Sequence, residues 1–252
     1  MVEQPSVEFR RRAIEPVACL KAGWQLIKDQ YWTFVGMSFV AILIGSLVPF
    51  GVILGPMMCG LYLSLFARRR GVTAEFGNLF KGFDYFGPSV VATLLHMIPI
   101  FVVIVPFYIV FYVAFFMAMA DSRHGGGNPD PSRMFGLFGI FAVFWLFFLL
   151  FMIVLSVLFA FAYPLIVDRK LSGLDAVKLS VSAGLANFWQ LLGLMLLNGL
   201  LGFLGVLLCY VGVLLVLPVS FAAIATAYEQ VFGLAYQSSL KSQLPPPPPS
   251  FA

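Results

Sequence analysis

Charged residues are scarce in this chain: Asp, Glu, Lys and Arg make up 10% of its 252 residues, while hydrophobic residues make up 61%. Typical globular domains carry roughly 25% charged residues. Charge is absent altogether from four long stretches, residues 31–67, 85–120, 134–167 and 179–228. Because about 20 consecutive apolar residues cross a bilayer as a helix, this shortage excludes a soluble protein and predicts an all-α membrane protein.

Catalytic and metal-binding signatures are missing as well. The sequence contains no G-x-S-x-G, H-E-x-x-H or P-loop motif and no C-x-x-C pair. We expect small buried or cytoplasmic thiols at its three cysteines, Cys19, Cys59 and Cys209. A Gly/Pro-rich loop holds Asp121, His124 and Asp130, but its composition favours a solvated connector over a cation site. The sequence therefore predicts no enzyme, no cofactor and no metal.

The lengths of the apolar stretches predict six transmembrane helices. The first and last stretches hold two each, and the middle two are one long helix each, in which Pro99, Pro106 and Pro164 allow kinks. Of the 15 Lys and Arg residues, only Arg123 and Arg133 fall on one side, which leaves 13 on the other. Basic residues favour the cytoplasm, so both termini are predicted to be cytoplasmic. Short basic clusters beside the membrane argue against nucleic-acid binding.

A short motif, one polar residue followed by two aromatic residues, occurs three times where the chain turns into an apolar run. It reads QYW at 30–32, DYF at 84–86 and NFW at 187–189. Aromatic rings favour headgroup depth, so we interpret each copy as an elbow between the membrane surface and the bilayer. The candidate interfacial residues are Tyr31, Trp32, Tyr85, Phe86, Phe188 and Trp189. An aromatic belt is the expected role, and a shared groove for a lipid headgroup or a partner is the alternative.

Apolar residues at helical spacing accompany each elbow and predict amphipathic interfacial helices. The three stripes are Val17, Leu20, Trp24, Ile27 and Tyr31; Phe76, Phe80, Phe83 and Phe86; and Leu174, Val177, Val181, Leu185 and Phe188. Ser172 with Asp175 resembles a capping box at the start of the last one. The prediction is six spans in three helix pairs, each pair preceded by an interfacial helix. The repeat units cover about 13–67, 72–167 and 172–233.

These units form one predicted membrane domain over residues 13–240, between a basic cytoplasmic segment at 1–12 and a proline-rich tail at 241–252. Five consecutive prolines favour an extended, disordered cytoplasmic tail. A docking peptide for an aromatic-lined groove is the alternative for this tail.

Polar residues inside the predicted spans are few, and three are candidates for function: His96, Asn198 and Glu229. We expect His96 to be a packing residue, Asn198 to form a hydrogen bond between helices, and Glu229 to lie at the solvated end of the last span. The alternatives are a metal ligand, a substrate contact and a proton-coupling carboxylate, respectively.

The stretch YPLIVDRKLSGLDAVKLSVSAGLANFWQLLGL at 163–194, with the paired apolar run to AYEQVFG and the GW at 23–24, resembles one family. This family comprises uncharacterised bacterial multi-pass proteins related to the membrane domain attached to some glycerophosphoryl diester phosphodiesterases. The resemblance implies a bacterial inner-membrane protein and brings no catalytic residues. The chain lacks a soluble region long enough for a phosphodiesterase barrel, so that activity is not expected.

The sequence therefore favours a non-enzymatic membrane component, a scaffold or accessory subunit that organises lipid or a partner complex. Its expected partners are membrane lipids and either another protein or a second copy of the chain. A small transporter or channel built from internal repeats is the competing hypothesis.

Overall fold

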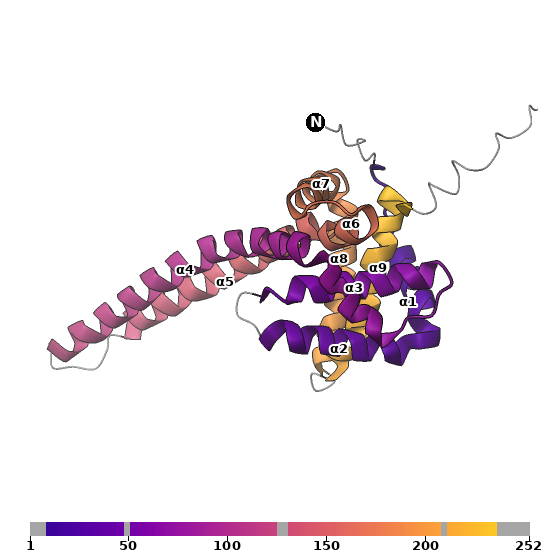
Figure 1. Ribbon diagram of the computed structural model, residues 1–252. Helices are drawn as coiled ribbons and strands as arrows, with labels where there is room; N and C mark the ends of the chain where they lie inside the picture. Colours follow the sequence, from indigo (N-terminus) through magenta and orange to yellow (C-terminus); the bar gives the residue numbers. More distant parts are fainter. Residues whose placement is uncertain (1–8, 48–50, 125–130, 208–210, 236–252) are drawn as a thin grey trace, which may run out of the picture.

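The computed structural model describes residues 9–47, 51–124, 131–207 and 211–235, and within these ranges all regular secondary structure is helical (Figure 1). The first group of helices comprises α1 (Pro16–Ile27), the 3-10 helix η1 (Lys28–Gln30), α2 (Tyr31–Leu47) and α3 (Leu54–Arg69). The second comprises the 3-10 helix η3 (Phe76–Tyr85), α4 (Phe86–His124), α5 (Pro131–Phe159) and α6 (Ala162–Arg169). The third comprises α7 (Gly173–Ala186), α8 (Phe188–Leu207) and α9 (Val211–Phe232). The predicted all-α class is confirmed.

Five helical stretches in the described residues are long and apolar enough to cross a membrane: Pro16–Leu47, Phe76–Ala120, Ser132–Arg169, Phe188–Leu207 and Gly212–Phe232. The predicted count of six is not confirmed, because the second expected span corresponds to α3. This helix has 16 residues, about 24 Å at 1.5 Å per residue, and most of its side chains are buried against other helices.

The core lies where the C-terminal parts of α3 and α9 meet the start of α6. The Tyr228 ring of α9 lies 5.6 Å from Phe66 of α3 and 6.1 Å from Phe161, the residue before α6. All three side chains are almost fully buried. Edge-to-face and tilted aromatic pairs of this kind add roughly 0.5–1.5 kcal/mol each beyond the burial of their surface. One helix from each group therefore contributes to the centre.

The surface helices α1, η3 and α7 bury both small and apolar residues and leave several of their large apolar residues exposed. On α1 the buried residues are Cys19, Gly23 and Ile27, whereas Val17 and Trp24 of the predicted stripe are exposed. The same holds for η3, which buries Leu79 and Gly82, and for α7, which buries Ala176, Ser180 and Ala183. The exposed apolar residues include Phe76, Phe80, Phe83 and Phe86 before α4, and Leu174 and Leu185 on α7.

The predicted stripes are packed only in part, because Ile27 and Val177 are buried whereas Trp24 and Leu185 are exposed. Close backbone contact explains why glycine is buried beside the exposed stripe residues. A Cβ atom on Gly23 would lie 2.7 Å from the backbone nitrogen of Ala223 on α9, closer than carbon and nitrogen atoms approach. In a membrane the surrounding lipid is as apolar as the protein interior. Apolar periodicity therefore identifies the helix but does not tell the lipid-facing side from the packed side.

The helices α4 and α5 form a long hairpin that extends away from the other helices (Figure 1). We call its outer part, residues 98–120 and 132–150, the arm. An aromatic ladder that includes Phe107, Phe111, Phe141 and Phe144 joins its two helices, and most of its other large apolar side chains are exposed. The prediction of one continuous helix holds for α4, which contains Pro99 and Pro106.

In the third apolar stretch, residues 134–167, the predicted long helix is divided near Pro164, one of the three prolines that allow a kink. The chain turns at residues 160–161, between α5 and α6. Pro164 lies in the first turn of α6, where its missing N–H needs no partner. The same proline could not donate a hydrogen bond to residue 160 in a continuous helix, which explains why the break falls there.

Candidate functional site

A cavity of about 440 Å³ lies between the three groups of helices, and we call it the central cavity. Its size falls within the range of roughly 300–1,000 Å³ that is typical of small-molecule sites. It is lined by Ile42, Leu54, Met58, Tyr62, Thr93, His96, Met97, Ser156, Phe159, Ala160, Tyr163, Met195, Phe221 and Ile224. These residues come from all three groups, and none of them carries a carboxylate, an ammonium or a guanidinium group.

The central cavity is apolar apart from a few neutral groups. Thr93 Oγ1 lies 2.8 Å from Ser89 O and 3.0 Å from the Tyr163 hydroxyl. Because the single Thr93 proton is donated to Ser89 O, the Tyr163 hydroxyl is the donor in the second bond. The Tyr163 oxygen therefore keeps acceptor capacity. The His96 ring stacks edge-on against Phe159, with 4.7 Å between ring centroids.

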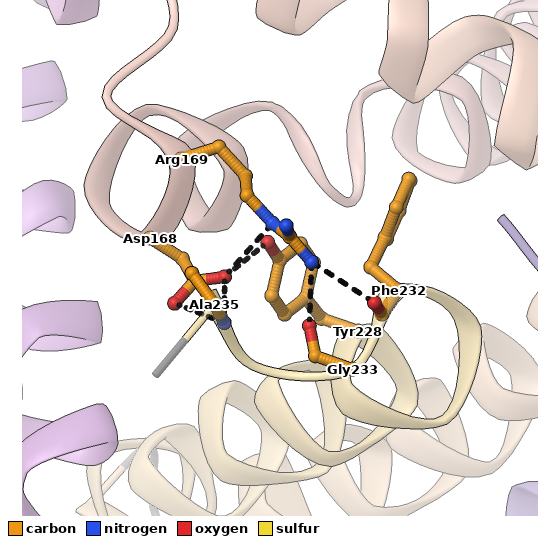
Figure 2. Close-up of polar contacts among 6 residues, drawn as sticks. All are labelled: Asp168, Arg169, Tyr228, Phe232, Gly233 and Ala235. Carbon is orange, nitrogen blue, oxygen red and sulfur yellow. Dashed lines mark hydrogen bonds and ion pairs between the residues drawn. The ribbon is translucent and has the colours of Figure 1, made fainter. Parts of the chain in front are cut away.

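A polar cluster joins the C-terminal end of α6 to the C-terminal end of α9 and the residues that follow it (Figure 2). The Asp168 carboxylate accepts a 2.8 Å hydrogen bond from the Tyr228 hydroxyl and bonds of 3.1 and 3.2 Å from Ala235 N. Arg169 donates through Nη2 to the carbonyls of Phe232 and Gly233 at 3.0 and 3.2 Å. Its Nε lies 3.3 Å from Asp168 Oδ2, which is an ion-pair distance. The cluster holds the two helix ends together.

Neither Asp168 nor Arg169 is among the predicted site residues, and Arg169 counts only as one of the 13 basic residues on the predicted cytoplasmic side. The signal available was the DRK triplet at 168–170, an acidic residue between an apolar helix and basic residues. Its partner Tyr228 lies 60 positions further along the chain, so no local pattern could have joined the two.

Two neighbours of Tyr228 bind other helices. Glu229 forms an ion pair of 2.8 Å with Arg69 at the end of α3. Gln230 Oε1 accepts hydrogen bonds of 3.1 Å from Glu15 N and from Cys19 Sγ at the start of α1. Three successive side chains of α9 thus contact three different segments, which indicates a structural junction.

The elbow residues lie in two environments. The first aromatic residue of each elbow, Tyr31, Tyr85 or Phe188, packs against the core. The second, Trp32, Phe86 or Trp189, is exposed by 73%, 44% and 77%, respectively. Each elbow also begins a long helix, because α2, α4 and α8 start at Tyr31, Phe86 and Phe188.

Polar elbow residues tie neighbouring groups of helices together. Gln30 pairs with the backbone of Ala74, which donates to Oε1 at 2.9 Å and accepts from Nε2 at 3.4 Å. Asn187 is fully buried, and its side chain accepts from Ala13 N and donates to Arg10 O, both at 3.2 Å. The first group is thus held to the second, and the third to the first. Both amides bind backbone of this chain.

The three candidate polar residues do not come together. His96 lines the central cavity, whereas Glu229 is in the ion pair with Arg69. The hydrogen bond predicted between helices for Asn198 is absent, since both its amide nitrogen and its amide oxygen are buried without a partner among the described residues.

The candidate cation ligands of the loop cannot be compared with the structure: Asp130 and the side chains of Asp121 and His124 lie outside the described residues, as do Cys209 and the tail at 241–252. Among the side chains that are described, no group of three or more His, Cys, Asp or Glu residues could hold a metal ion. Cys19 and Cys59 are free and buried, as expected of structural thiols.

Comparisons with known proteins found no matching family model, no matching curated protein and no matching solved structure. The resemblance to proteins related to phosphodiesterase membrane domains therefore stays a hypothesis.

Proposed function

We propose that this protein is a non-enzymatic component of a bacterial inner membrane, a scaffold or accessory subunit, and that its arm organises the surrounding lipid. The observation that carries the proposal is the length and exposure of the arm. The uncharged part of α4, residues 86–120, measures about 52 Å, whereas the hydrocarbon core of a bilayer is about 30 Å thick. None of its most apolar window is buried inside the protein.

Lipid is a better occupant of the arm surface than a specific partner helix. Helices that associate in membranes use small or polar residues at their contact. Most exposed residues of the arm are large and apolar instead, such as Val110, Phe116, Phe138 and Val143, although the small residues Gly136, Gly139 and Ala142 are exposed among them on α5. An apolar helix longer than the bilayer tilts or thickens the lipid around it, and this is the proposed means by which the arm orders lipid.

The proposal includes three repeat units, 13–67, 72–167 and 172–233, arranged in a closed ring. It is supported by the packing of each surface helix on the preceding group: η3 lies on α3, α7 on α5 and α6, and α1 on α9. The backbone conformation after the last helix of each group also supports the repeat. A left-handed residue follows the C-terminal helix of each group, namely Gly71, Lys170 and Gly233, with φ of +79°, +53° and +63°. Such residues end helices by turning the chain.

We also propose that both ends of the membrane domain lie in the cytoplasm. Arg68 at the end of α3 forms an ion pair of 3.1 Å with Asp29, just before α2. The α2–α3 hairpin thus starts and finishes on the same face, even though α3 is short. The 13 to 2 division of basic residues favours the cytoplasm for that face.

The proposed effect of the arm on lipid is tested by deleting facing segments of equal length from its two helices. Deleting 110–116 and 135–141 removes about two turns from each helix while keeping their antiparallel pairing, because Phe111 packs on Phe141. Variants with Trp145 as the only tryptophan are reconstituted in mixtures of brominated short-chain and long-chain phosphatidylcholines. Quenching of Trp145 is expected to show a preference of the full-length arm for long chains, and the shortened arm is expected to lose it.

A matched control keeps the length of the arm and changes two exposed residues, Val110→Leu and Val113→Leu. It should retain the long-chain preference. Equal quenching by short and long lipids in the full-length protein would refute the role of the arm. A protein that co-purifies stoichiometrically with the full-length arm only would assign the arm to a partner complex.

A small transporter or channel is the second candidate, because the central cavity is lined by all three groups of helices. Its polar candidates are His96, Asn198 and Glu229. If the triple variant His96→Leu, Asn198→Leu and Glu229→Gln leaves liposome fluxes of ions and small solutes unchanged, transport loses its candidates.

A further inference from the structure

We propose that the central cavity binds one long acyl chain and hydrogen-bonds the carbonyl group at the end of that chain. The ligand is either the chain of a membrane phospholipid or a free fatty acid. The site is separate from the arm, so it stands or falls independently of the proposed scaffold function.

The walls of the cavity fit a flexible hydrocarbon chain. Met58, Met97 and Met195 lie at its surface with Ile42, Phe159 and Phe221. Methionine side chains are unbranched and polarisable, so they adapt to an apolar ligand of irregular shape. Apart from α3, which carries Met58, the helices that carry these residues are long and apolar enough to cross a membrane, where acyl chains are the abundant apolar molecules. Burying such a chain is favourable because it replaces unfilled space by dispersion contacts.

Two neutral side chains at the cavity surface, His96 and Tyr163, can form hydrogen bonds with the polar end of the ligand. His96 has no hydrogen-bond partner among the described residues although it lines the cavity. A neutral imidazole offers both a donor and an acceptor. Tyr163 donates to Thr93 and keeps its oxygen free as an acceptor. A carbonyl oxygen can accept from His96, and the hydroxyl of a protonated acid can donate to Tyr163.

The absence of charge from the lining limits which end of a lipid can enter. A buried phosphate or ammonium group needs an opposite charge or several hydrogen bonds, and none of the lining residues supplies such a charge. The charged groups Arg169 and Glu229 are engaged with Asp168 and Arg69 instead. A phosphate headgroup must therefore remain outside while the chain occupies the cavity.

The test uses the full-length protein in nanodiscs of phosphatidylethanolamine and phosphatidylglycerol with one of two photoreactive probes. One probe is a fatty acid with a diazirine near the end of its chain, and the other is a phosphatidylcholine with the same diazirine acyl chain. Cross-linked residues are mapped by mass spectrometry. We expect labelling of Met58, which is only 7% exposed and lines the cavity. The probe that labels Met58 identifies the source of the chain, and labelling by neither probe overturns the proposal.

Matched pairs of variants separate the cavity from the general lipid-facing surface. Met195→Trp fills the cavity, whereas Leu196→Trp adds the same bulk on the exposed side of α8. Ile42→Trp and Leu43→Trp form the corresponding pair on α2. Overfilling should reduce the labelling of Met58 about tenfold, and the two outward variants should leave it unchanged. Equal labelling in all four folded variants would contradict the assignment.

The polar end is tested with His96→Leu and Tyr163→Phe, and Tyr112→Phe on the exposed surface of the arm is the control. In either cavity variant, the loss of one hydrogen bond to the ligand should raise about three- to tenfold the concentration of unlabelled oleic acid that is needed to reduce the labelling of Met58. If Met195→Trp and Ile42→Trp both fail to fold, the proposal is tested by competition of unlabelled lipid against the labelling of Met58 in the wild-type protein. Labelling of Met58 that excess oleic acid and excess phosphatidylcholine both fail to reduce would overturn the proposal.

Discussion

Replacing Asp168 should destabilise the junction of α6 and α9 more than replacing any exposed acidic residue. The Asp168 side chain is only 4% exposed, and it accepts from Tyr228 and Ala235 while pairing with Arg169. Removing one partner of a buried ion pair costs ~3–5 kcal/mol. The Arg169 side chain is 21% exposed, and water screens part of its charge, so we expect about 2–4 kcal/mol for Asp168→Ala.

The loss is measured by thermal unfolding in detergent followed by tryptophan fluorescence. A protein of this size loses about 2–4 °C per kcal/mol, so the midpoint for Asp168→Ala should fall by about 4–16 °C. Asp168→Asn keeps an acceptor for Tyr228 and should lose about half as much. The exposed Asp84→Ala serves as the control and should change stability by less than about 0.5 kcal/mol.

A double-mutant cycle with Tyr228→Phe isolates the hydrogen bond itself. Tyr228→Phe should cost about 1 kcal/mol, and the double variant with Asp168→Ala should cost less than the sum of the two, by about 1 kcal/mol. Strict additivity, together with a loss below about 1 kcal/mol for Asp168→Ala, would refute the reasoning that this cluster holds the two helices together.

Two further pairs of variants test contacts between helix groups. Asn187→Leu removes three hydrogen bonds from a fully buried amide and should lower the free energy of unfolding by about 2 kcal/mol. Hydrogen exchange should also show faster exchange of the backbone amides at residues 10–14. Asn198→Leu removes an amide without partners and should leave stability unchanged or raise it. Gly23→Ala should cost about 1–3 kcal/mol because the new Cβ meets the backbone of α9, whereas Gly199→Ala, where a Cβ meets nothing within 4 Å, should gain about 0.5–1 kcal/mol in thermal unfolding. Equal effects within either pair would contradict the packing described.

Local signals predicted where the helices begin. The elbows mark the starts of α2, α4 and α8, because a polar residue and a pair of aromatics occur together where the chain changes direction. In the first and third elbows, the polar residue, Gln30 or Asn187, also binds backbone. The cap at Ser172 is confirmed, since its hydroxyl accepts from Asp175 N at 3.2 Å. Both signals depend on neighbours within a few residues, which a sequence displays directly.

Which side of a helix faces the core could not be predicted in the same way. Trp24 and Leu185 continue an apolar stripe but face outward, while Gly23 and Gly184 pack inward. Lipid and core are equally apolar, so hydropathy does not separate them, and only the distant backbone of α9 or α5 explains why glycine is buried. The central cavity was missed for the same reason, because its lining is assembled from residues of all three groups.

The central claim is that three elbows turn the chain into the bilayer at one depth on the cytoplasmic side. It is tested with three variants that each keep one tryptophan, at Trp32, at Trp189 or at position 86 through Phe86→Trp, in vesicles of phosphatidylcholine brominated at known depths. All three side chains are exposed. The account predicts the same quenching depth at the headgroup boundary and equal access for an aqueous quencher added on the cytoplasmic face. Three different depths, or an elbow reached only from the opposite face, would contradict it.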